Sequence, residues 1–298
     1  MERLTKPPRA QPNAPDWWAV EAFWPLADYS EFYRDGPLLW HVQRFGKGPL
    51  AVLLHGTGAS CHSMAALAQE LSSSHHVLLF DLPGHGFTQT ANGFDPTLDE
   101  VSLAIERALS GLDLMPDLII GHSAGAAIGL KLAHLISDDR IGVVSINGAL
   151  KPFEGVMGLI APVTAKLFTF GGFAAGALAR NAGNIRRVRE LIEGTGSLIS
   201  ESGLKQYHYL MRNRAHIQGT LKLMAHWDLA EIPHICRQLP NATLFLVGDR
   251  DRAVSPTGSR EICRMMSGGD FQSLRGLGHL VHEEDPRAVA ELIIRWHS

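Results

Sequence analysis

The stretch Leu118-Ile119-Ile120-Gly121-His122-Ser123-Ala124-Gly125 decides how this chain folds. It starts with a short apolar run, and residues 124–136 that follow have the periodicity of a helix. The pentapeptide at the junction has the pattern Gly-x-Ser-x-Gly, which is common by chance but informative between a strand and a helix. We therefore predict a sharp turn from strand to helix, with Ser123 at its apex.

Both glycines of this pattern have a physical reason. A sharp, strained turn projects the hydroxyl of Ser123 away from the backbone, and side chains at positions 121 and 125 would collide with neighbouring backbone. The helix after the turn directs the positive end of its dipole at the site, which favours developing negative charge. We interpret Ser123 as an activated nucleophile.

Other short apolar runs resemble the one before Ser123. Strands of a parallel sheet are covered on both faces, so runs of this length predict a mostly parallel central sheet. Helical patterns separate them, which predicts an α/β fold with right-handed crossovers. The predicted strands are residues 38–45, 50–54, 77–80, 118–120, 141–146, 244–247 and 271–274, and the predicted helices are residues 63–71, 98–112, 124–136, 260–266 and 286–296.

The alternation breaks between about residues 150 and 240, where the patterns are helical throughout. We predict an α/β core of residues 1–150 and 241–298, with a helical cap of residues 151–240 inserted before the strand that bears the catalytic acid. Residues 156–179 are strongly apolar but contain Lys166, Pro162 and Gly171-Gly172, so a membrane-spanning helix is not expected there. This part of the cap packs on the core, lines an apolar pocket or touches a membrane.

A serine hydroxyl is a poor nucleophile without a base. His279 follows the predicted strand 271–274, in a loop at the carboxyl edge of the sheet where a base would reach Ser123. His282 is a competitor in the same segment. We predict His279 as the base.

The base in turn needs an acid that fixes its tautomer and stabilises the imidazolium. Asp249 and Asp251 both lie in the loop after the predicted strand 244–247, and either one alone could be an ordinary turn residue. The chain order serine, aspartate, histidine is that of one known fold. We predict Asp251 as the acid and keep Asp249 as the alternative.

Acyl transfer also needs backbone N–H donors for an oxyanion. Ala124, directly after the serine, should supply one donor. The other should come from the loop after the predicted strand 50–54, where glycines flank Thr57 and let its amide turn inward. We predict Thr57 and Ala124 as the oxyanion hole.

The overall composition limits the classes of function that the chain can have. With 298 residues, 45% of them hydrophobic, the chain can bury one sizeable core. Its 27 Lys and Arg against 30 Asp and Glu give a net charge of −3. The chain has no excess of basic residues, so we do not expect a nucleic-acid partner. The sparse cysteines, Cys61, Cys236 and Cys263, predict buried thiols in a reducing compartment, and residues 1–15 lack the apolar core of a secretory signal. We expect a cytoplasmic protein.

These pieces together resemble the α/β-hydrolase superfamily over roughly residues 30–298. The resemblance implies the α/β-hydrolase fold, and it favours Asp251 because the acid of the family sits two residues after an Asp249-like position. Some members carry the acid after the preceding strand, which ends here in Asn147. Relatives with an aspartate nucleophile cleave carbon–halogen bonds, and Ser123 argues against that chemistry. Besides the Ser123 turn and Asp251, the matching segments are His55-Gly56, Asp81-Leu82-Pro83-Gly84-His85-Gly86 and Gly278-His279.

A more specific resemblance is to the magnesium-chelatase accessory proteins of bacteriochlorophyll biosynthesis. It implies a role near magnesium insertion, with magnesium chelatase as partner, a tetrapyrrole as substrate, and a location peripheral to the inner or photosynthetic membrane. Cys61, where Ser or Thr is expected, is a minor departure. The matching segments are His55-Gly56-Thr57-Gly58-Ala59-Ser60, Gly121 to Ala127, Asn147-Gly148-Ala149-Leu150, Leu38 to Arg44, Glu193-Gly194-Thr195-Gly196-Ser197 and Trp227-Asp228-Leu229.

Two hypotheses on function follow. In the first, the protein is a serine hydrolase of a small apolar, ester-like substrate and needs no metal or organic cofactor. In the second, it binds a porphyrin or the chelatase without hydrolysis, because a fold does not fix a function. His208, His216 and His226 of the cap could bind the magnesium of a porphyrin, but magnesium prefers oxygen ligands, so ordinary polar histidines are expected.

Overall fold

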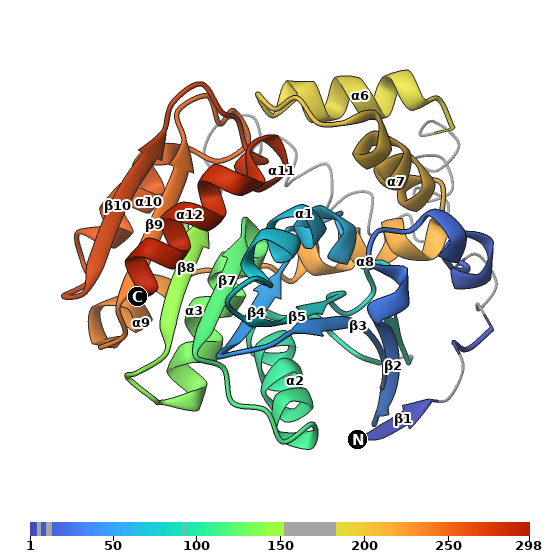
Figure 1. Ribbon diagram of the computed structural model, residues 1–298, viewed down its shortest axis with the longest axis horizontal. Helices are drawn as coiled ribbons and strands as arrows, with labels where there is room; N and C mark the ends of the chain where they lie inside the picture. Colours follow the sequence, from blue (N-terminus) through green and yellow to red (C-terminus); the bar gives the residue numbers. More distant parts are fainter. Residues whose placement is uncertain (5–6, 10–13, 92, 152–182) are drawn as a thin grey trace.

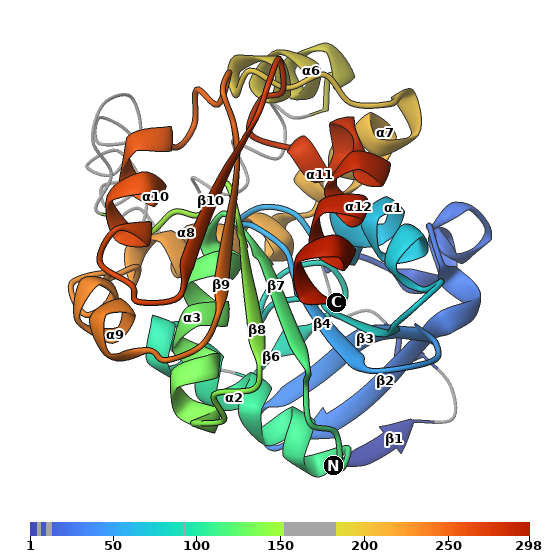
Figure 2. The ribbon, with the colours of Figure 1, turned by 60° about the vertical axis from the view of Figure 1, so that its left-hand side comes forward.

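The computed structural model describes residues 1–4, 7–9, 14–91, 93–151 and 183–298. Figures 1 and 2 show one twisted sheet with helices on both faces and a group of helices over one edge. The strongly apolar residues 156–179 lie outside the described residues. In the part of the chain that is described, no helix is both long and apolar enough to cross a bilayer.

The sheet runs in the order β1-β2-β3-β5-β4-β7-β8-β9-β10, with β6 paired to β3. The pairs from β5 to β10 along this order are parallel, and those that involve β1, β2, β3 and β6 are antiparallel. The strands are β1 (Glu2–Leu4), β2 (Ser30–Asp35), β3 (Leu38–Gly46), β4 (Leu50–Leu54), β5 (His76–Phe80), β6 (Gln89–Thr90), β7 (Leu118–His122), β8 (Gly142–Ile146), β9 (Thr243–Gly248) and β10 (Gly269–Leu274).

Every predicted strand is present, with its ends within about two residues of the expected positions. The prediction of an α/β-hydrolase fold with a mostly parallel sheet is confirmed. The helices are α1 (Cys61–Leu71), α2 (Leu98–Gly111), α3 (Ala124–Ile136), α6 (Ile185–Gly194), α7 (Glu201–Met211), α8 (Arg214–Ala225), α9 (Ile232–Gln238), α10 (Pro256–Cys263), α11 (Val281–Glu284) and α12 (Pro286–His297).

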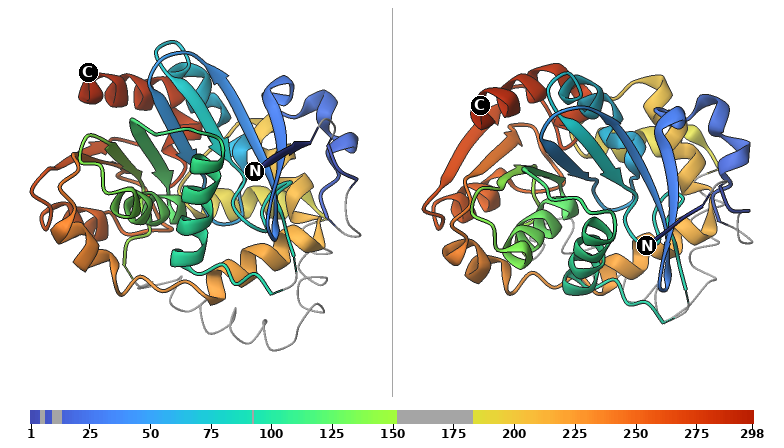
Figure 3. Two further views of the ribbon diagram at one scale, coloured as in Figure 1. Left: turned by 90° about the horizontal axis from the view of Figure 1, so that it is seen from below. Right: turned by 60° about the horizontal axis from the view of Figure 1, so that its bottom comes forward.

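Alternation along the central strands explains the two layers of helices. In β4, Val52 and Leu54 join the core cluster shared with α2, α3, α9 and α10, whereas Ala51 and Leu53 join the cluster shared with α1, α11 and α12. All four side chains are fully buried, so β4 is apolar on both faces. Figure 3 shows α1 and α12 on one side of the sheet and α2 and α3 on the other.

Two local predictions differ from the structure. The helix expected at residues 260–266 is α10, which already begins at Pro256, because proline at the first helical position needs no N–H partner. The N-terminal strands β1 and β2 were not predicted. Three short 3-10 helices lie between them (Trp17–Ala19, Glu21–Phe23 and Ala27–Tyr29), and in this segment Trp17 and Trp24 are buried against Phe87. Aromatic packing stabilises the segment, and its sequence has no regular hydrophobic pattern that would predict it.

Helices α6, α7 and α8 form the described part of the cap over the carboxyl edge of the sheet (Figure 1). Residues 183–242 contain no strand, in agreement with the helical pattern. Helix α9 also falls within the expected cap segment, but its Ile232 and Ile235 pack in the core cluster with α3. The division of the chain at residues 150 and 241 stays a proposal.

A buried carboxylate fixes the loops at this edge of the sheet. Asp81, at the end of β5, accepts hydrogen bonds from the amides of Cys61 (2.6 Å) and Phe87 (2.8 Å) and from Nδ1 of His41 (2.8 Å). Burial alone would raise the pKa of Asp81, but His41 and the amide donors outweigh it and hold this pKa below its ordinary value. The carboxylate also leaves no room at Gly86 (φ +52°), where a Cβ would lie 2.1 Å from Oδ2 of Asp81.

Replacing Asp81 by Asn should therefore destabilise the protein strongly. The side-chain NH₂ of asparagine would face backbone N–H groups that need an acceptor. The expected loss in the free energy of unfolding is about 3–5 kcal/mol, as for other broken buried pairs. Asp99→Asn removes the charge of an exposed aspartate from an ion pair with Lys131, which keeps Glu231 as a partner, and is the matched control with an expected loss below about 1 kcal/mol. Urea denaturation measures both, and equal losses would contradict the anchoring role of Asp81.

Candidate active site

Ser123 lies at the sharp turn between β7 and α3, as predicted. Its φ of +52° is rare for a residue with a side chain, and its amide donates to the carbonyl of Ile146 in β8 at 3.0 Å. A Cβ at Gly121 would lie 2.1 Å from the carbonyl oxygen of Gly125, and one at Gly125 would lie 2.2 Å from that of Leu54. Neighbouring backbone thus excludes side chains on both sides of Ser123, as the sequence pattern indicates.

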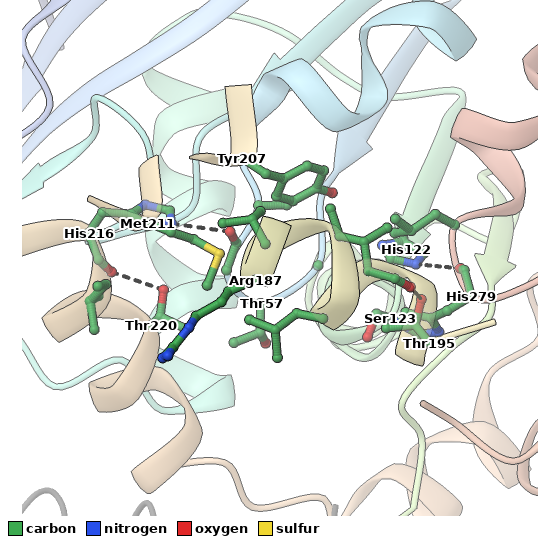
Figure 4. Close-up of a pocket in the computed structure, with 18 of the residues that line it drawn as sticks. Thr57, His122, Ser123, Arg187, Thr195, Tyr207, Met211, His216, Thr220 and His279 are labelled. Atoms are coloured by element: carbon green, nitrogen blue, oxygen red, sulfur yellow. Dashed lines mark hydrogen bonds between the residues drawn. The ribbon is translucent and has the colours of Figure 1, made fainter. Parts of the chain in front are cut away.

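His279 and Asp251 form a hydrogen-bonded pair beside this turn. Nδ1 of His279 donates to Oδ2 of Asp251 at 2.8 Å, so in the neutral ring Nε2 is the bare nitrogen. Oδ1 of Asp251 accepts the amides of Ala253 (2.8 Å) and Val254 (2.9 Å), which fixes the carboxylate in its loop. Both Ser123 and His279 line the same cavity, and Figure 4 shows them at one end of it.

The two alternatives occupy other positions. Oδ1 of Asp249 accepts the amide of Gly276 at 2.7 Å, so this aspartate ties two turns together. His282 is fully buried, its Nε2 lies 2.9 Å from Oγ of Ser63, and it is not among the residues that line the cavity. The structure therefore places His279, rather than His282, on the cavity that Ser123 also lines, and it pairs His279 with Asp251 rather than with Asp249.

The loop after β4 approaches Ser123 closely. A Cβ at Gly56 would lie 3.0 Å from Cβ of Ser123, so only glycine lets the loop come this near. Thr57 follows and lines the cavity. The amide of Ala124 opens α3, and amides of a first helical turn have no acceptor within the helix. Thr57 is thus next to the glycine that approaches Ser123, and Ala124 directly follows Ser123, whereas their role as oxyanion donors stays a proposal.

The cavity has a volume of about 800 Å³. Its core side holds Ser123 and His279, and helices α6, α7 and α8 supply most of its remaining wall. The surface of the cavity is mainly apolar. The cap contributes six apolar residues to it, Val188, Leu191, Ile192, Met211, Ile217 and Leu221, and six polar or charged ones, Arg187, Glu190, Thr195, Tyr207, His216 and Thr220.

Sequence reasoning missed the role of Asn147. Its Nδ2 donates to Oδ2 of Asp251 at 2.6 Å, which gives this carboxylate oxygen a second donor beside His279. Asn147 has a φ of +45°, a conformation that asparagine tolerates better than most residues. The sequence does hold a signal for this role, because Asn147 stands directly after a predicted strand, at the position where some family members carry the acid.

A strap from the cap also supports the site. Gly196, with a φ of +90°, packs so tightly on the acid-bearing loop that a Cβ would lie 2.1 Å from the carbonyl oxygen of Arg250. The amide of Arg252 donates to the carbonyl of Thr195 at 3.0 Å, and the amide of Leu280 donates to Oγ of Ser197 at 2.8 Å. Residues 195–197 therefore join the loops that carry Asp251 and His279.

Among the described residues, His41, Cys61 and Asp81 form a group whose ligand atoms lie close enough for a metal ion. All three are buried, the Asp81 carboxylate already accepts several N–H groups, and burial raises the pKa of the Cys61 thiol well above its ordinary value. This donor set does not fit a metal and forms a structural hydrogen-bond network. The cap histidines have other partners: His208 lies 3.2 Å from the carbonyl of Gly183, and His226 Nδ1 lies 2.9 Å from that of Lys222.

Known proteins agree with this architecture. A family model described as the alpha/beta hydrolase family matches residues 51–292. The chain belongs to the alpha/beta hydrolase family. A putative lipase from Acinetobacter baumannii has a similar fold, with a TM-score of 0.76 and 21% identity over 90% of each chain.

Two relatives within this family bear on function. The chain is 33% identical to the magnesium-chelatase 30 kDa subunit of Rhodobacter capsulatus over 280 residues, which cover 93% of this chain and 98% of that protein. It is 27% identical to a pimeloyl-[acyl-carrier protein] methyl ester esterase of Xylella fastidiosa over 245 residues, 77% of this chain and 91% of the esterase. The resemblances inferred from the sequence motifs are thereby confirmed.

Gly125→Ala should disrupt the turn at Ser123. Because the new Cβ would meet the backbone of Leu54, we expect a loss of about 1–3 kcal/mol in the free energy of unfolding, or failure to fold. Gly258→Ala in α10 is the control, since its nearest contact is the side chain of Lys151 at 3.8 Å and alanine is the better helix former. Chemical denaturation distinguishes them, and a Gly125→Ala protein as stable as wild type would refute this packing argument.

Stability should fall as the pH decreases from 6.5 toward about 4. Burial lowers the pKa of His62 and His282 to about 3 and that of His216 to about 4, so the unfolded chain binds protons in this range that the folded chain does not. Glu283 opposes this trend, because burial raises its pKa to about 7 and its stabilising contribution is lost as the pH rises from 4.5 to 7.

Urea midpoints at several pH values between 7 and 4 measure this dependence. Glu283→Gln removes the opposing contribution, so its stability should fall more steeply on acidification than that of the wild type. Stability that is constant or rises toward pH 4 would contradict the assignment of neutral, buried histidines.

Proposed function

We propose that this protein is a serine hydrolase of ester-like acyl substrates. The observation that carries the proposal is the hydrogen bond of 2.8 Å from Nδ1 of His279 to Asp251, which leaves Nε2 of His279 as a base in the cavity that Ser123 also lines. Relatives named as esterases, such as that of Xylella fastidiosa, support hydrolysis as the general activity.

The proposed reaction has two halves. Oγ of Ser123 attacks the carbonyl carbon while Nε2 of His279 takes its proton, and the amides of Thr57 and Ala124 donate to the resulting oxyanion. His279 then gives the proton to the leaving alkoxide, and an acyl-enzyme remains. A water molecule, deprotonated by His279, attacks this ester and releases the acid. Asp251 stabilises the imidazolium in both halves, and no metal or organic cofactor is needed.

The cavity favours an apolar substrate. Its volume of about 800 Å³ lies within the roughly 300–1,000 Å³ typical of small-molecule sites, and its surface is mainly apolar. Because the chain resembles a magnesium-chelatase subunit over most of its length, we propose that it acts at magnesium insertion in bacteriochlorophyll biosynthesis. The substrate would be a tetrapyrrole or another apolar acyl compound, magnesium chelatase the partner, and the location cytoplasmic with peripheral contact to the inner or photosynthetic membrane.

A second candidate rests on the same relative. The name of the Rhodobacter capsulatus protein describes a chelatase subunit and not a hydrolase. In this alternative the cavity binds a porphyrin, or the cap binds the chelatase, and the hydrolase fold serves as a scaffold. The two candidates differ in whether the biological role requires the Ser123 hydroxyl.

Ser123→Ala should abolish turnover of p-nitrophenyl esters, with an expected loss of about 10⁴-fold or more. The variant should also no longer be labelled by a fluorophosphonate, which reacts with activated serines. Ser73→Ala, an exposed serine after α1, is the matched control and should behave as wild type. Unchanged turnover or labelling in Ser123→Ala would disprove the proposed nucleophile.

Asp251→Asn should lower kcat by about 10⁴-fold, because an amide at this position favours the wrong tautomer of His279. Asp249→Asn, two residues away and bonded to Gly276 instead, should change kcat by less than about threefold. Steady-state kinetics on one ester substrate measures both variants. Equal losses in the two would show that the assignment of the acid is wrong.

Complementation separates the two candidate functions. In a strain that lacks this gene and makes no bacteriochlorophyll, the wild-type chain should restore pigment. Ser123→Ala should fail to restore it if hydrolysis is the biological role. Full restoration by Ser123→Ala would instead support the non-hydrolytic chelatase accessory function.

A further inference from the structure

Two buried histidines connect the same pair of loops next to the proposed oxyanion hole. His55 accepts the amide of Leu82 at Nε2 (2.9 Å), and its Nδ1 lies 2.7 Å from the carbonyl oxygen of Gly56. His216 accepts the amide of Gly86 at Nδ1 (3.0 Å), and its Nε2 lies 3.1 Å from the carbonyl oxygen of Gly58. Each ring thus joins the turn of residues 81–88 to the loop of residues 55–60.

These contacts determine both tautomers. A ring nitrogen that accepts an amide carries no proton, so a neutral His55 has its proton on Nδ1 and a neutral His216 on Nε2. Both therefore donate to carbonyl groups of the loop. Burial lowers the pKa of His55 below its ordinary value and that of His216 to about 4, which keeps both rings neutral at neutral pH.

The orientation of the Thr57 amide follows from these bonds. The carbonyl of Gly56 and the N–H of Thr57 belong to one planar peptide and point in opposite directions. His55 and the amide of Ala59 (3.2 Å) both donate to that carbonyl, so the Thr57 N–H is turned away from them. His216 donates to the carbonyl of Gly58, two residues after Gly56. Gly58 has a φ of +79°, and because glycine is flexible, this hydrogen bond restrains the loop at that point.

His216 differs from His55 because it comes from the cap. Its helix, α8, lies directly on the core: a Cβ at Gly219 would be 2.0 Å from the carbonyl oxygen of Gly84. Thr220 donates to the carbonyl of His216 at 2.9 Å and packs over Gly58. Figure 4 shows His216 and Ser123 at opposite ends of the cavity, with Thr57 between them. His216 therefore lies away from Ser123, where the reacting carbonyl would be, and both of its ring nitrogens already have hydrogen-bond partners, so we assign it no proton transfer.

We propose that His216 is a positioning residue, through which the cap helix α8 holds the Thr57 amide in place for the oxyanion. The inference rests on the proposed function as a serine hydrolase. It makes the oxyanion hole a joint product of core and cap, since one of its two loops is correctly oriented only when α8 is docked. The cap would then contribute to the rate of acyl transfer as well as to the enclosure of substrate.

The test compares His216→Leu, His216→Gln and the wild type. Leucine fills the space but makes neither hydrogen bond, so kcat for a p-nitrophenyl ester should fall about 10- to 100-fold while KM changes less than about threefold, because misplacing a donor costs less than deleting it. Glutamine can accept from Gly86 and donate to Gly58, and should recover kcat to within about fivefold of wild type. His208→Leu, at a partly exposed histidine of α7, is the control and should match wild type.

Rates are expressed per active site, counted by fluorophosphonate titration, so that partial unfolding does not imitate the effect. A boronic acid that mimics the tetrahedral intermediate should bind His216→Leu more weakly by the same factor as kcat/KM. A purely structural role would lower the number of active sites and leave kcat per site unchanged. That result, or equal losses in the Leu and Gln variants, would overturn the proposal.

Hydrogen–deuterium exchange separates this inference from the proposed function. His216→Leu should raise exchange in residues 56–60 about tenfold and leave β9 unchanged, whether or not Ser123 is reactive. If the wild type neither hydrolyses esters nor reacts with fluorophosphonate, the hydrolase function fails, but raised exchange would still show that His216 holds the loop. Unchanged exchange in residues 56–60 would overturn the positioning role even in an active hydrolase.

Discussion

The site depends on one buried charge. The carboxylate of Asp81 collects the first amide of α1, the amide of Phe87 and the ring of His41 at the carboxyl end of β5. Because these donors come from separate segments, the carboxylate fixes the turn of residues 81–88 against both α1 and the antiparallel part of the sheet. His55 and His216 then bond to that turn, and through them the loop beside Ser123 takes its position. The Asp81 carboxylate is not proposed to contact the substrate, but it orders the loop that carries a proposed oxyanion donor.

Much of this arrangement could be predicted from sequence, for reasons that differ between residues. The strand β7 and helix α3 follow from an apolar run and a helical period, and Gly121 and Gly125 mark the turn because backbone crowds both positions. The predicted nucleophile, base and acid lie together because the carboxyl ends of parallel strands meet at one edge of a sheet. Their catalytic roles remain proposals, although their proximity is now a property of the structure.

Other features have no local signature. Strands β1 and β2 depend on pairing with other strands and on a buried aromatic cluster around Trp17 and Trp24. A local hydrophobic pattern predicts neither the pairing nor the cluster. The roles of Asn147, Thr195 and His216 arise from contacts across long stretches of chain, with residues near positions 251, 252 and 58. Fifteen histidines in the sequence look alike, and only the fold separates buried, bridging rings from exposed ones.

The strap of residues 195–197 has a consequence for how such proteins diversify. Gly196 sits against the backbone of Arg250 with no space for a side chain, and its neighbours bond to Arg252 and Leu280. The cap is therefore not a detachable module that could be exchanged between relatives at its two ends. A transplanted cap would have to bring a glycine at this point together with the matching loops of the recipient, so cap and core are expected to be inherited as a unit.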